Sequence, residues 1–350
     1  MIQTKWGELL VITQKQCRDL ITDAEVLKLV EQVLADYANG DAVNPIKVHL
    51  PFFPDYNGWN NAMPGWLKKQ DIHGIKWAGF GFDNAAKFGV PCCSAVIVLN
   101  DMETAFPVAL LDGTTVMAMR TGAAAAVMAK YNVKKSAKVA TLLGAGVQGT
   151  SGMEMILLAL PQLEEVRVMD LFQSQVDKCI AALKAKFPKI KFVGTTDKHA
   201  ACKGTDLVLT AVHNPDPAAT TDVLDDVEFE NGVTVVTIAG GMSSTKYPKV
   251  FDRIVMDFAE CLCHRHNVTI DYMKQCFNVD VQPMSADICD AEIGDIILGK
   301  AIGRTNDEEK VYCTSVGMGI EDLIVANDIY QKAKARDIGQ VISVIDDIGQ

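Results

Sequence analysis

The stretch that decides the fold is Lys138-Val-Ala-Thr-Leu-Leu-Gly144-Ala-Gly146-Val-Gln-Gly149. An apolar run typical of a buried strand leads directly into three glycines, and a helix-type segment follows over Gln148–Leu160. Gly144 permits a tight turn, Gly146 lets a pyrophosphate approach the backbone, and Gly149 allows close packing of helix on strand. A lone G-x-G-x-x-G is weak, but this context indicates a dinucleotide-binding loop at a helix N-terminus.

Asp170 is the second part of this pattern. It ends the next predicted strand, Glu165–Asp170, at the distance of about 20 residues where an acidic side chain accepts hydrogen bonds from the ribose hydroxyls. A carboxylate there repels a 2′-phosphate, and Leu171 supplies no positive charge to offset it. The sequence therefore predicts NAD rather than NADP. The alternative is a glycine-rich turn with a capping aspartate.

Strand-type and helix-type segments alternate after Lys135. The predicted strands are Lys138–Leu143, Glu165–Asp170, Ile190–Val193, Asp206–Thr210, Thr234–Ala239 and Arg253–Asp257. Alternation of this kind predicts an α/β fold with a parallel sheet and crossover helices, here a Rossmann-type, doubly wound NAD(P)-binding domain over residues 131–319.

The rest of the chain has a different pattern. Helical periodicity follows Thr13 and recurs up to Tyr37, and short strand-type runs fill the chain from Ile46 to Leu99. Asp112-Gly113 is predicted as a turn before a helix over Val116–Tyr131, and the last 30 residues, from Ile320, are predicted as helical.

Composition limits the class of protein. A chain of 350 residues favours two domains, and a hydrophobic fraction of 49% with 22% charged residues is ordinary for a globular protein. The net charge of −11 argues against a nucleic-acid or anionic-membrane partner. No signal peptide or membrane-length apolar run is present, and ten scattered cysteines do not suggest a disulfide scaffold. We expect a cytoplasmic protein.

Several motifs occur in a common order along the chain. They are Asn44-Pro-Ile-Lys47, Met63-Pro-Gly, Gly74-Ile-Lys76, Leu110-Leu-Asp-Gly113 to Arg120-Thr-Gly-Ala-Ala, Leu143-Gly-Ala-Gly-Val-Gln148, and Ser315-Val-Gly-Met-Gly-Ile-Glu-Asp322. On these motifs the chain, from about Val11 to Ala333, resembles the ornithine cyclodeaminase/mu-crystallin family. The resemblance implies a discontinuous α+β substrate and dimerisation domain, residues 1–130 with 320–350, a central NAD(P) domain, and a homodimer.

The resemblance also implies the chemistry and the residues that carry it. Members exchange a hydride between nicotinamide and the α-carbon of an amino or imino acid. Lys76 matches the family lysine that contacts the substrate carboxylate, and Arg120 matches an arginine between substrate and cofactor. A carboxylate needs such cationic partners. The alternatives are a strand-end lysine in solvent for Lys76, an exposed strand lysine for Lys47, and a surface or structural arginine for Arg120. Lys47 and Met63 complete the expected substrate set. The expected cofactor set is Arg120, Thr121, Gly144, Gly146, Val147, Gln148, Gly149, Asp170, Leu171, Thr210, Val212 and Ser315.

Two departures from the family pattern narrow the reaction. Lys47 stands where the family usually has Arg, and a lysine cannot make the same two-pronged contact. Met242 stands where cyclodeaminases carry an Asp, and a thioether cannot act as a base. Unless Asp257 or another carboxylate substitutes, this favours an imine or ketimine reductase or an amino-acid dehydrogenase. A cyclodeaminase-type ammonia-lyase and a mu-crystallin-like ligand-binding protein are the alternatives.

Other reactive or charged side chains have no clear catalytic or metal-binding role in the sequence. Cys261-Leu-Cys263-His264-Arg-His266 lacks the spacing of a zinc site, so no metal is expected. His213 borders the cofactor or lies on a surface loop with about equal chance. Glu321 and Asp322 are expected at the start of the last helix, where acidic side chains interact favourably with the helix dipole.

Overall fold

The computed structural model describes residues 5–52, 55–212, 223–238, 250–277 and 283–345. The chain divides into two compact units, residues 1–120 with 318–350 and residues 121–317. The division after Arg120 falls inside helix α4 (Gly113–Asn132), earlier in the chain than the boundary expected from the sequence. Each unit is described by itself below.

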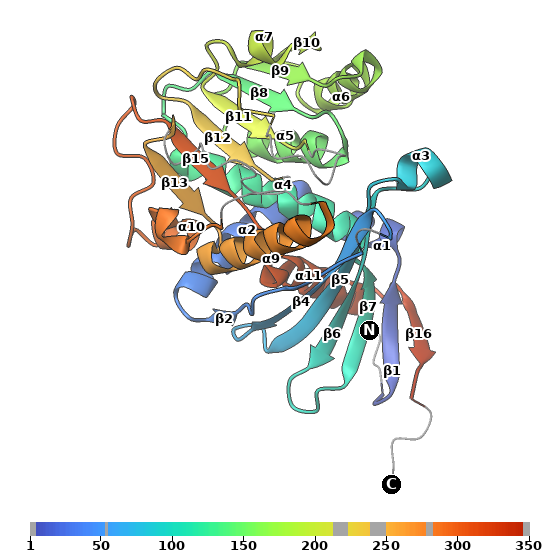
Figure 1. Ribbon diagram of the computed structural model, residues 1–350. Helices are drawn as coiled ribbons and strands as arrows, with labels where there is room; N and C mark the ends of the chain where they lie inside the picture. Colours follow the sequence, from blue (N-terminus) through green and yellow to red (C-terminus); the bar gives the residue numbers. More distant parts are fainter. Residues whose placement is uncertain (1–4, 53–54, 213–222, 239–249, 278–282, 346–350) are drawn as a thin grey trace. The chain divides into compact units, whose positions relative to one another are not determined.

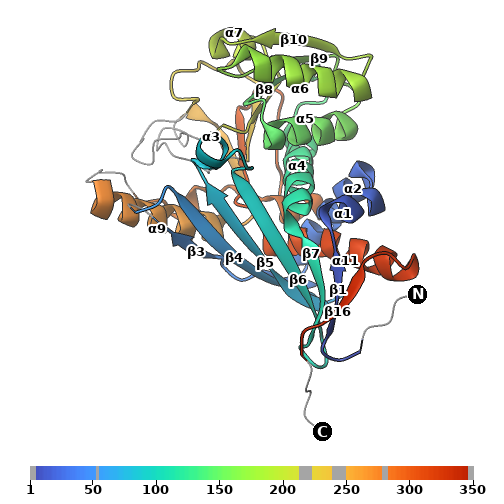
Figure 2. The same ribbon diagram turned by 90° about the vertical axis from the view of Figure 1, so that its right-hand side faces the viewer.

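The first unit contains one mixed sheet and the helices that accompany it. Its strands are β1 (Glu8–Ile12), β2 (Ala42–Val43), β3 (Val48–Pro51), β4 (Gly58–Leu67), β5 (Ile72–Gly81), β6 (Cys93–Asp101), β7 (Pro107–Asp112) and β16 (Gln340–Ser343). Its helices are α1 (Gln14–Leu20), α2 (Asp23–Ala38), α3 (Asn84–Phe88), the first part of α4, and α11 (Gly319–Ala335). The strand order is β16-β1-β7-β6-β5-β4-β2, with β3 also paired to β4 (Figure 2).

Strands β4 to β7 form an antiparallel meander in which successive side chains point to opposite faces. On β5, Lys76 is 1% exposed whereas its neighbour Trp77 is 43% exposed. Helix α11 packs on β4, β5 and β6, and α2 packs on α11. The helix α11 therefore covers the buried face of the meander, which is the face that carries Lys76.

The second unit is built on a parallel sheet. Its strands are β8 (Val139–Leu143), β9 (Glu165–Met169), β10 (Lys191–Thr195), β11 (Leu207–Thr210), β12 (Thr234–Thr237), β13 (Arg253–Met256), β14 (Ala291–Glu292) and β15 (Val311–Thr314). Its described helices are the rest of α4, α5 (Val147–Ala159), α6 (Gln173–Lys186), α7 (Lys198–Cys202), α9 (Ala259–Phe277), a short 3-10 turn η1 (Ala286–Ile288) and α10 (Ile293–Ile297). The order is β10-β9-β8-β11-β12-β15-β13-β14 (Figure 1).

Helices cover both faces of this sheet, as neighbouring residues of β8 show. The Thr141 hydroxyl donates to the carbonyl of Ala201 on α7. The next side chain, Leu142, points the other way, and its Cδ1 lies 3.1 Å from the position a Cβ would take on Gly149 in α5. The predicted Rossmann-type, doubly wound arrangement is confirmed, with the first five strands in the order typical of that fold.

Several strands were not predicted from the sequence, and two predictions are wrong. The chain end is not helical throughout, because β16 follows α11 and pairs antiparallel with β1. The predicted turn at Asp112-Gly113 is a strand-to-helix junction, since the Asp112 carboxylate accepts from the backbone N–H of Thr114 and of Thr115, each at 3.0 Å. Short strands such as β15 and β16 are specified by partners distant in sequence, which local pattern does not reveal.

Two further findings concern the chain as a whole. Of the helices that the structure describes, none combines the length and apolarity that crossing a membrane requires. The nine cysteines whose side chains the structure describes are free thiols.

Candidate functional site

A cluster of four charged side chains is buried in the first unit. Lys76 lies on β5, Arg120 on α4, and Glu321 and Asp322 in the first turn of α11. Lys76 is 1% exposed, Arg120 6%, and both carboxylates 0%. Such groups are almost never fully buried unless they are paired, so each must have a partner inside the unit.

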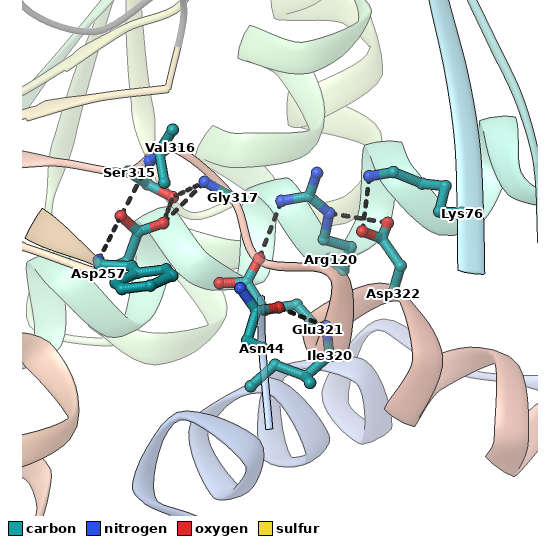
Figure 3. A network of polar contacts seen from close by, with 11 residues as sticks. Asn44, Lys76, Arg120, Asp257, Ser315, Val316, Gly317, Ile320, Glu321 and Asp322 are labelled. Atoms are coloured by element: carbon teal, nitrogen blue, oxygen red, sulfur yellow. Dashed lines mark hydrogen bonds and ion pairs between the residues drawn. The ribbon is translucent and has the colours of Figure 1, made fainter. Parts of the chain in front are cut away.

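The two carboxylates provide those partners (Figure 3). Lys76 Nζ donates to Asp322 Oδ2 at 2.6 Å, and Arg120 Nε donates to Asp322 Oδ1 at 2.9 Å. Arg120 Nη1 donates to Glu321 Oε2 at 2.8 Å. Asp322 thus bridges the two cations, while Glu321 pairs with the arginine.

The electrostatics of the cluster set the protonation of its members. Burial, together with the nearby Arg120 charge, lowers the pKa of Lys76 from its usual 10.5 to about 8, although Asp322 opposes this. Burial also disfavours the charge on Arg120, but Asp322 and Glu321 outweigh it and raise the pKa of the guanidinium. Arg120 is therefore a permanent cation, whereas Lys76 exchanges its proton near neutral pH.

Close backbone packing fixes the start of α11. A Cβ on Gly319 would lie 2.7 Å from the Met63 carbonyl oxygen and 2.8 Å from that of Pro64, so this position accepts only glycine. The backbone N–H of Ile320 donates to Asn44 Oδ1 at 3.2 Å. These contacts hold the turn that carries both carboxylates against β4.

The other predicted substrate residues are also buried. Lys47 is 5% exposed and immediately precedes β3, and Met63 is 4% exposed and pairs with Lys76 across β4 and β5. Solvent-exposed positions are therefore wrong for Lys47, Lys76 and Arg120 alike, which leaves a structural role as the alternative for Arg120. The structure brings Lys76, Met63 and Arg120 into one region of the first unit.

The glycine-rich loop lies in the second unit, between β8 and α5. Gly144 has φ +94°, a conformation that favours glycine, and a Cβ there would lie 2.9 Å from Val212 Cγ2. Gly149 is closer still, since a Cβ would lie 1.9 Å from the Gly144 carbonyl oxygen. At Gly146, by contrast, a Cβ would have no described atom within 4 Å. The loop thus requires glycine at 144 and 149 for its own packing, whereas Gly146 leaves open space beside the backbone.

Asp170 follows β9 and points toward this loop. Its Oδ2 accepts from the backbone N–H of Ala145 at 2.9 Å, and its Oδ1 accepts from that of Phe172 at 3.1 Å. A carboxylate offers about four acceptor positions, so two remain for the hydroxyls of a ribose. Leu171 is 77% exposed and adds no cation. An open backbone at Gly146 with an acidic side chain beside it fits the pyrophosphate and adenosine ribose of NAD.

Most of the remaining predicted cofactor residues lie at the start of α5 or at the end of β11. Val147 and Gln148 are in the first turn of α5, where unpaired N–H groups favour an anion, and Val212 and Thr210 follow or end β11. Thr121 is 9% exposed on α4. These placements agree with the borders of a dinucleotide site in a Rossmann-type fold.

Ser315 has a different environment. Its hydroxyl donates to Asp257 Oδ2 at 2.7 Å, and the backbone N–H groups of Val316 and Gly317 donate to the same carboxylate (Figure 3). The backbone N–H of Phe258 also donates to Asp257. Asp257 therefore holds the segment after β15, and its oxygens are already engaged, which argues against its use as the base that a cyclodeaminase would need.

Some sequence predictions fall elsewhere. Met242 with Gly240 and Gly241, and also His213, lie outside the described residues. Cys261 and Cys263 are buried on α9, and no group of three metal-capable side chains occurs among the residues that the structure describes.

Glu321 and Asp322 are the functional candidates that the sequence interpretation missed. They do open a helix, as expected, but they are completely buried and paired with Lys76 and Arg120 rather than solvated. The available signal was their place at the end of the motif Ser315 to Asp322, directly before the apolar run Leu323 to Ala326.

Comparison with known proteins agrees with this arrangement. Residues 8–337 match the ornithine cyclodeaminase/mu-crystallin family. The chain belongs to this family. The family resemblance predicted from the sequence is confirmed over nearly the whole chain.

Three relatives illustrate the range of its activities. The chain is 28% identical over 320 residues to an N-((2S)-2-amino-2-carboxyethyl)-L-glutamate dehydrogenase of Staphylococcus aureus, covering 89% of this chain and 91% of that protein. It is 25% identical, with TM-score 0.81, to a Delta(1)-pyrroline-2-carboxylate reductase of Thermococcus litoralis solved with NADH and L-proline. That match covers 95% of this chain and 99% of the reductase. It is 27% identical, with TM-score 0.81, to an archaeal alanine dehydrogenase dimer with bound NAD. That match covers 97% of this chain and 100% of the dehydrogenase chain.

Proposed function

We propose that the chain is an NAD-dependent reductase or dehydrogenase acting at the Cα–N bond of a small amino or imino acid. The observation that carries this proposal is the buried pair Lys76 and Arg120, two cations held together by Asp322. The relatives named above act on amino or cyclic imino acids, and two of them were solved with NAD or NADH.

Lys76 and Arg120 would bind the substrate carboxylate. Within the described part of the chain, Asp322 and Glu321 engage Arg120 Nε and Nη1, and the third guanidinium nitrogen points away from both carboxylates (Figure 3). Lys76 uses one of its three N–H donors on Asp322. The remaining donors suit a carboxylate because charge-assisted hydrogen bonds in a buried site are strong. Lys47, which is also buried, is proposed as a third cation for the same substrate.

Lys76 is also the proposed proton donor. With its pKa lowered to about 8, the ammonium can give a proton to the substrate nitrogen and recover it near neutral pH. In the second unit, the Gly144–Gly149 loop and Asp170 would hold the dinucleotide by its pyrophosphate and ribose. NAD supplies the hydride that is exchanged with the α-carbon. Holding the reactants in line can lower the barrier by about 7–11 kcal/mol, so the chain needs no nucleophile.

We also propose a homodimer formed through the exposed face of the first unit's sheet. Val48, Trp77 and Val96 lie in one row across β3, β5 and β6 and are 65%, 43% and 45% exposed. An apolar face of this kind is unusual on a monomer. The archaeal alanine dehydrogenase, which shares the fold over its whole length, is a dimer. The free cysteines of the described residues also support the expected reducing, cytoplasmic setting.

One assay distinguishes the proposed activity from its alternatives. The purified protein is incubated with NADH, ammonia or an amine, and a panel of 2-oxo acids and cyclic imines, and NADH absorbance is followed. Oxidation of NADH with any of them supports the proposal. Ammonia release from ornithine without net NADH change would identify a cyclodeaminase, and ligand binding without turnover of any kind would identify a binding protein.

A further inference from the structure

We propose that Asp322 is a positioning residue that holds Lys76 and Arg120 side by side, and both charged, before a substrate arrives. The inference rests on the proposed function, in which these two cations bind the substrate carboxylate. It adds a role for the end of the chain, since Asp322 lies 246 residues beyond Lys76.

The geometry of the carboxylate carries the argument. Its two oxygens are divided between the cations, Oδ2 to Lys76 Nζ at 2.6 Å and Oδ1 to Arg120 Nε at 2.9 Å. Two buried cations repel each other strongly when no anion lies between them. A single bridging carboxylate removes that repulsion and fixes the spacing of the two donors at once. Lys76 Nζ and the third guanidinium nitrogen of Arg120 lie on the same side of the Asp322 carboxylate (Figure 3).

The position of Asp322 is itself fixed. Besides the contacts of Gly319 and Ile320, a Cβ on Gly65 would lie 2.9 Å from Ile320 Cγ2, and a Cβ on Gly74 would lie 3.2 Å from Leu323 Cδ2. The first turn of α11 therefore packs on glycines of β4 and β5 at distances that allow little movement. A carboxylate on such a turn can act as a rigid reference point, which pre-organisation of a binding site requires.

Folding alone gives no reason for these charges. The same turn already buries the apolar side chains of Ile320, Leu323 and Ile324. Buried ion pairs add little stability compared with apolar residues of similar volume, because desolvation cancels much of the attraction. A buried cluster of titratable groups with a lowered lysine pKa is instead typical of a functional site.

The groups that face Lys76 determine how it responds to a change at Asp322. Arg120 from α4 lowers its pKa, and Asp322 and Glu321 from α11 raise it. On β6, Cys93 also lies within electrostatic range of Lys76, and burial raises the pKa of that thiol to about 12, so it stays neutral. Without the charge of Asp322, only Glu321 on α11 would offset the effect of Arg120 on Lys76, so the pKa of Lys76 should fall.

The test is Asp322→Asn, with Asp328→Asn as the matched control. Asparagine keeps the shape but loses the charge, and its amide nitrogen would face one of the two cations as a second donor. Asp328 lies on the same helix, paired with Lys332 near the surface. For Asp322→Asn we expect the basic limb of the pH profile of reductive kcat/KM to move down by about one pH unit, and KM for the oxo or imino acid to rise about 10-fold or more. KM for NADH and all parameters of Asp328→Asn should stay unchanged.

A second measurement does not depend on turnover. Lysine labelled with ¹³C at Cε reports the titration of Lys76 by NMR, and Lys76→Met assigns its resonance. We expect a midpoint near 8 in the unaltered protein and a lower midpoint in Asp322→Asn. If no substrate is found, the proposed function fails but this titration still decides the inference. An unchanged midpoint, or equal loss of activity at every pH with no change in KM, would show that Asp322 is only structural.

Discussion

The carboxylate of Asp170 accepts a hydrogen bond from the backbone N–H of Ala145, with 2.9 Å between Oδ2 and the nitrogen. The acidic side chain at the end of β9 is thereby tied to the glycine-rich loop between β8 and α5. A pyrophosphate on the loop and a ribose on the carboxylate would be bound by one connected piece of structure. This link explains how two motifs separated in sequence can recognise one dinucleotide.

The first prediction concerns the choice between NAD and NADP. The double variant Asp170→Ser with Leu171→Arg should lower the ratio of kcat/KM for NADH to that for NADPH by about 100-fold, because a repelling charge is replaced by an attracting one. Serine retains an acceptor for the Ala145 N–H. Leu171→Arg alone, which keeps the carboxylate, should change the ratio much less. Preference for NADPH by the unaltered protein would contradict the assignment of Asp170.

Two glycines of the loop should respond in opposite ways. Gly146→Ala places a methyl group where no described atom lies within 4 Å, so the melting temperature should stay within about 2 °C. The methyl group would occupy the path of the pyrophosphate, and the Kd for NADH should rise by about 10-fold or more. Gly149→Ala would place its Cβ 1.9 Å from the Gly144 carbonyl oxygen, so it should lose stability or fail to fold. Thermal unfolding and a fluorescence titration with NADH separate the two outcomes, and equal NADH affinity in Gly146→Ala would refute the binding role of the loop.

The contrast between these two parts of the chain shows what sequence can predict. The loop, Asp170 and the alternating strands are local patterns, so their spacing alone indicated the Rossmann-type unit. The pairing of Lys76 with Asp322 joins residues 246 positions apart. Although an apolar run follows it, an acidic pair at the start of a helix is equally typical of residues that stabilise the helix dipole. The insertion of β15 between β12 and β13 has the same origin, because only the folded chain shows which strands pair.

A third prediction follows from the titration of Lys76. Its pKa is lowered to about 8, so the group is protonated below that value and loses its proton as pH rises through it. Reductive kcat/KM should therefore be highest below about pH 8 and fall above it, whereas the oxidative direction should gain activity over the same range. Lys76→Arg, which cannot release its proton in this range, should lower kcat in both directions, and the activity that remains should lack this limb. The transition is expected within about one pH unit of 8. If the profiles of the unaltered protein show no transition between about pH 7 and 9, Lys76 is excluded as the proton donor.

The geometry around Arg120 leads to a fourth prediction. Arg120 contacts two carboxylates with two of its nitrogens, and the third is the nitrogen proposed to contact the substrate. A lysine keeps the charge but has one nitrogen, so Arg120→Lys cannot make all these contacts. We expect KM for the oxo or imino acid to rise about 10- to 100-fold, with a change in NADH binding smaller than about 3-fold. Arg18→Lys, at a surface pair with Asp23, is the matched control and should leave both values unchanged. A KM unaffected by Arg120→Lys would remove Arg120 from the substrate site.

The last prediction concerns the exposed sheet face of the first unit. Because Val48 and Val96 lie in the same cross-strand row as Trp77, lysines at both positions would place two charges in the middle of the proposed interface. The double variant Val48→Lys with Val96→Lys should shift the particle mass, measured by sedimentation, from twice the chain mass of 38.0 kDa to that of a single chain. Leu158→Lys, at a position 41% exposed on α5 of the second unit, introduces a similar change away from this face and should leave the mass unaltered. A dimer that persists in the double variant would place the interface elsewhere, because buried unpaired lysines at the centre of a contact cost several kcal/mol each, roughly enough to dissociate an ordinary dimer.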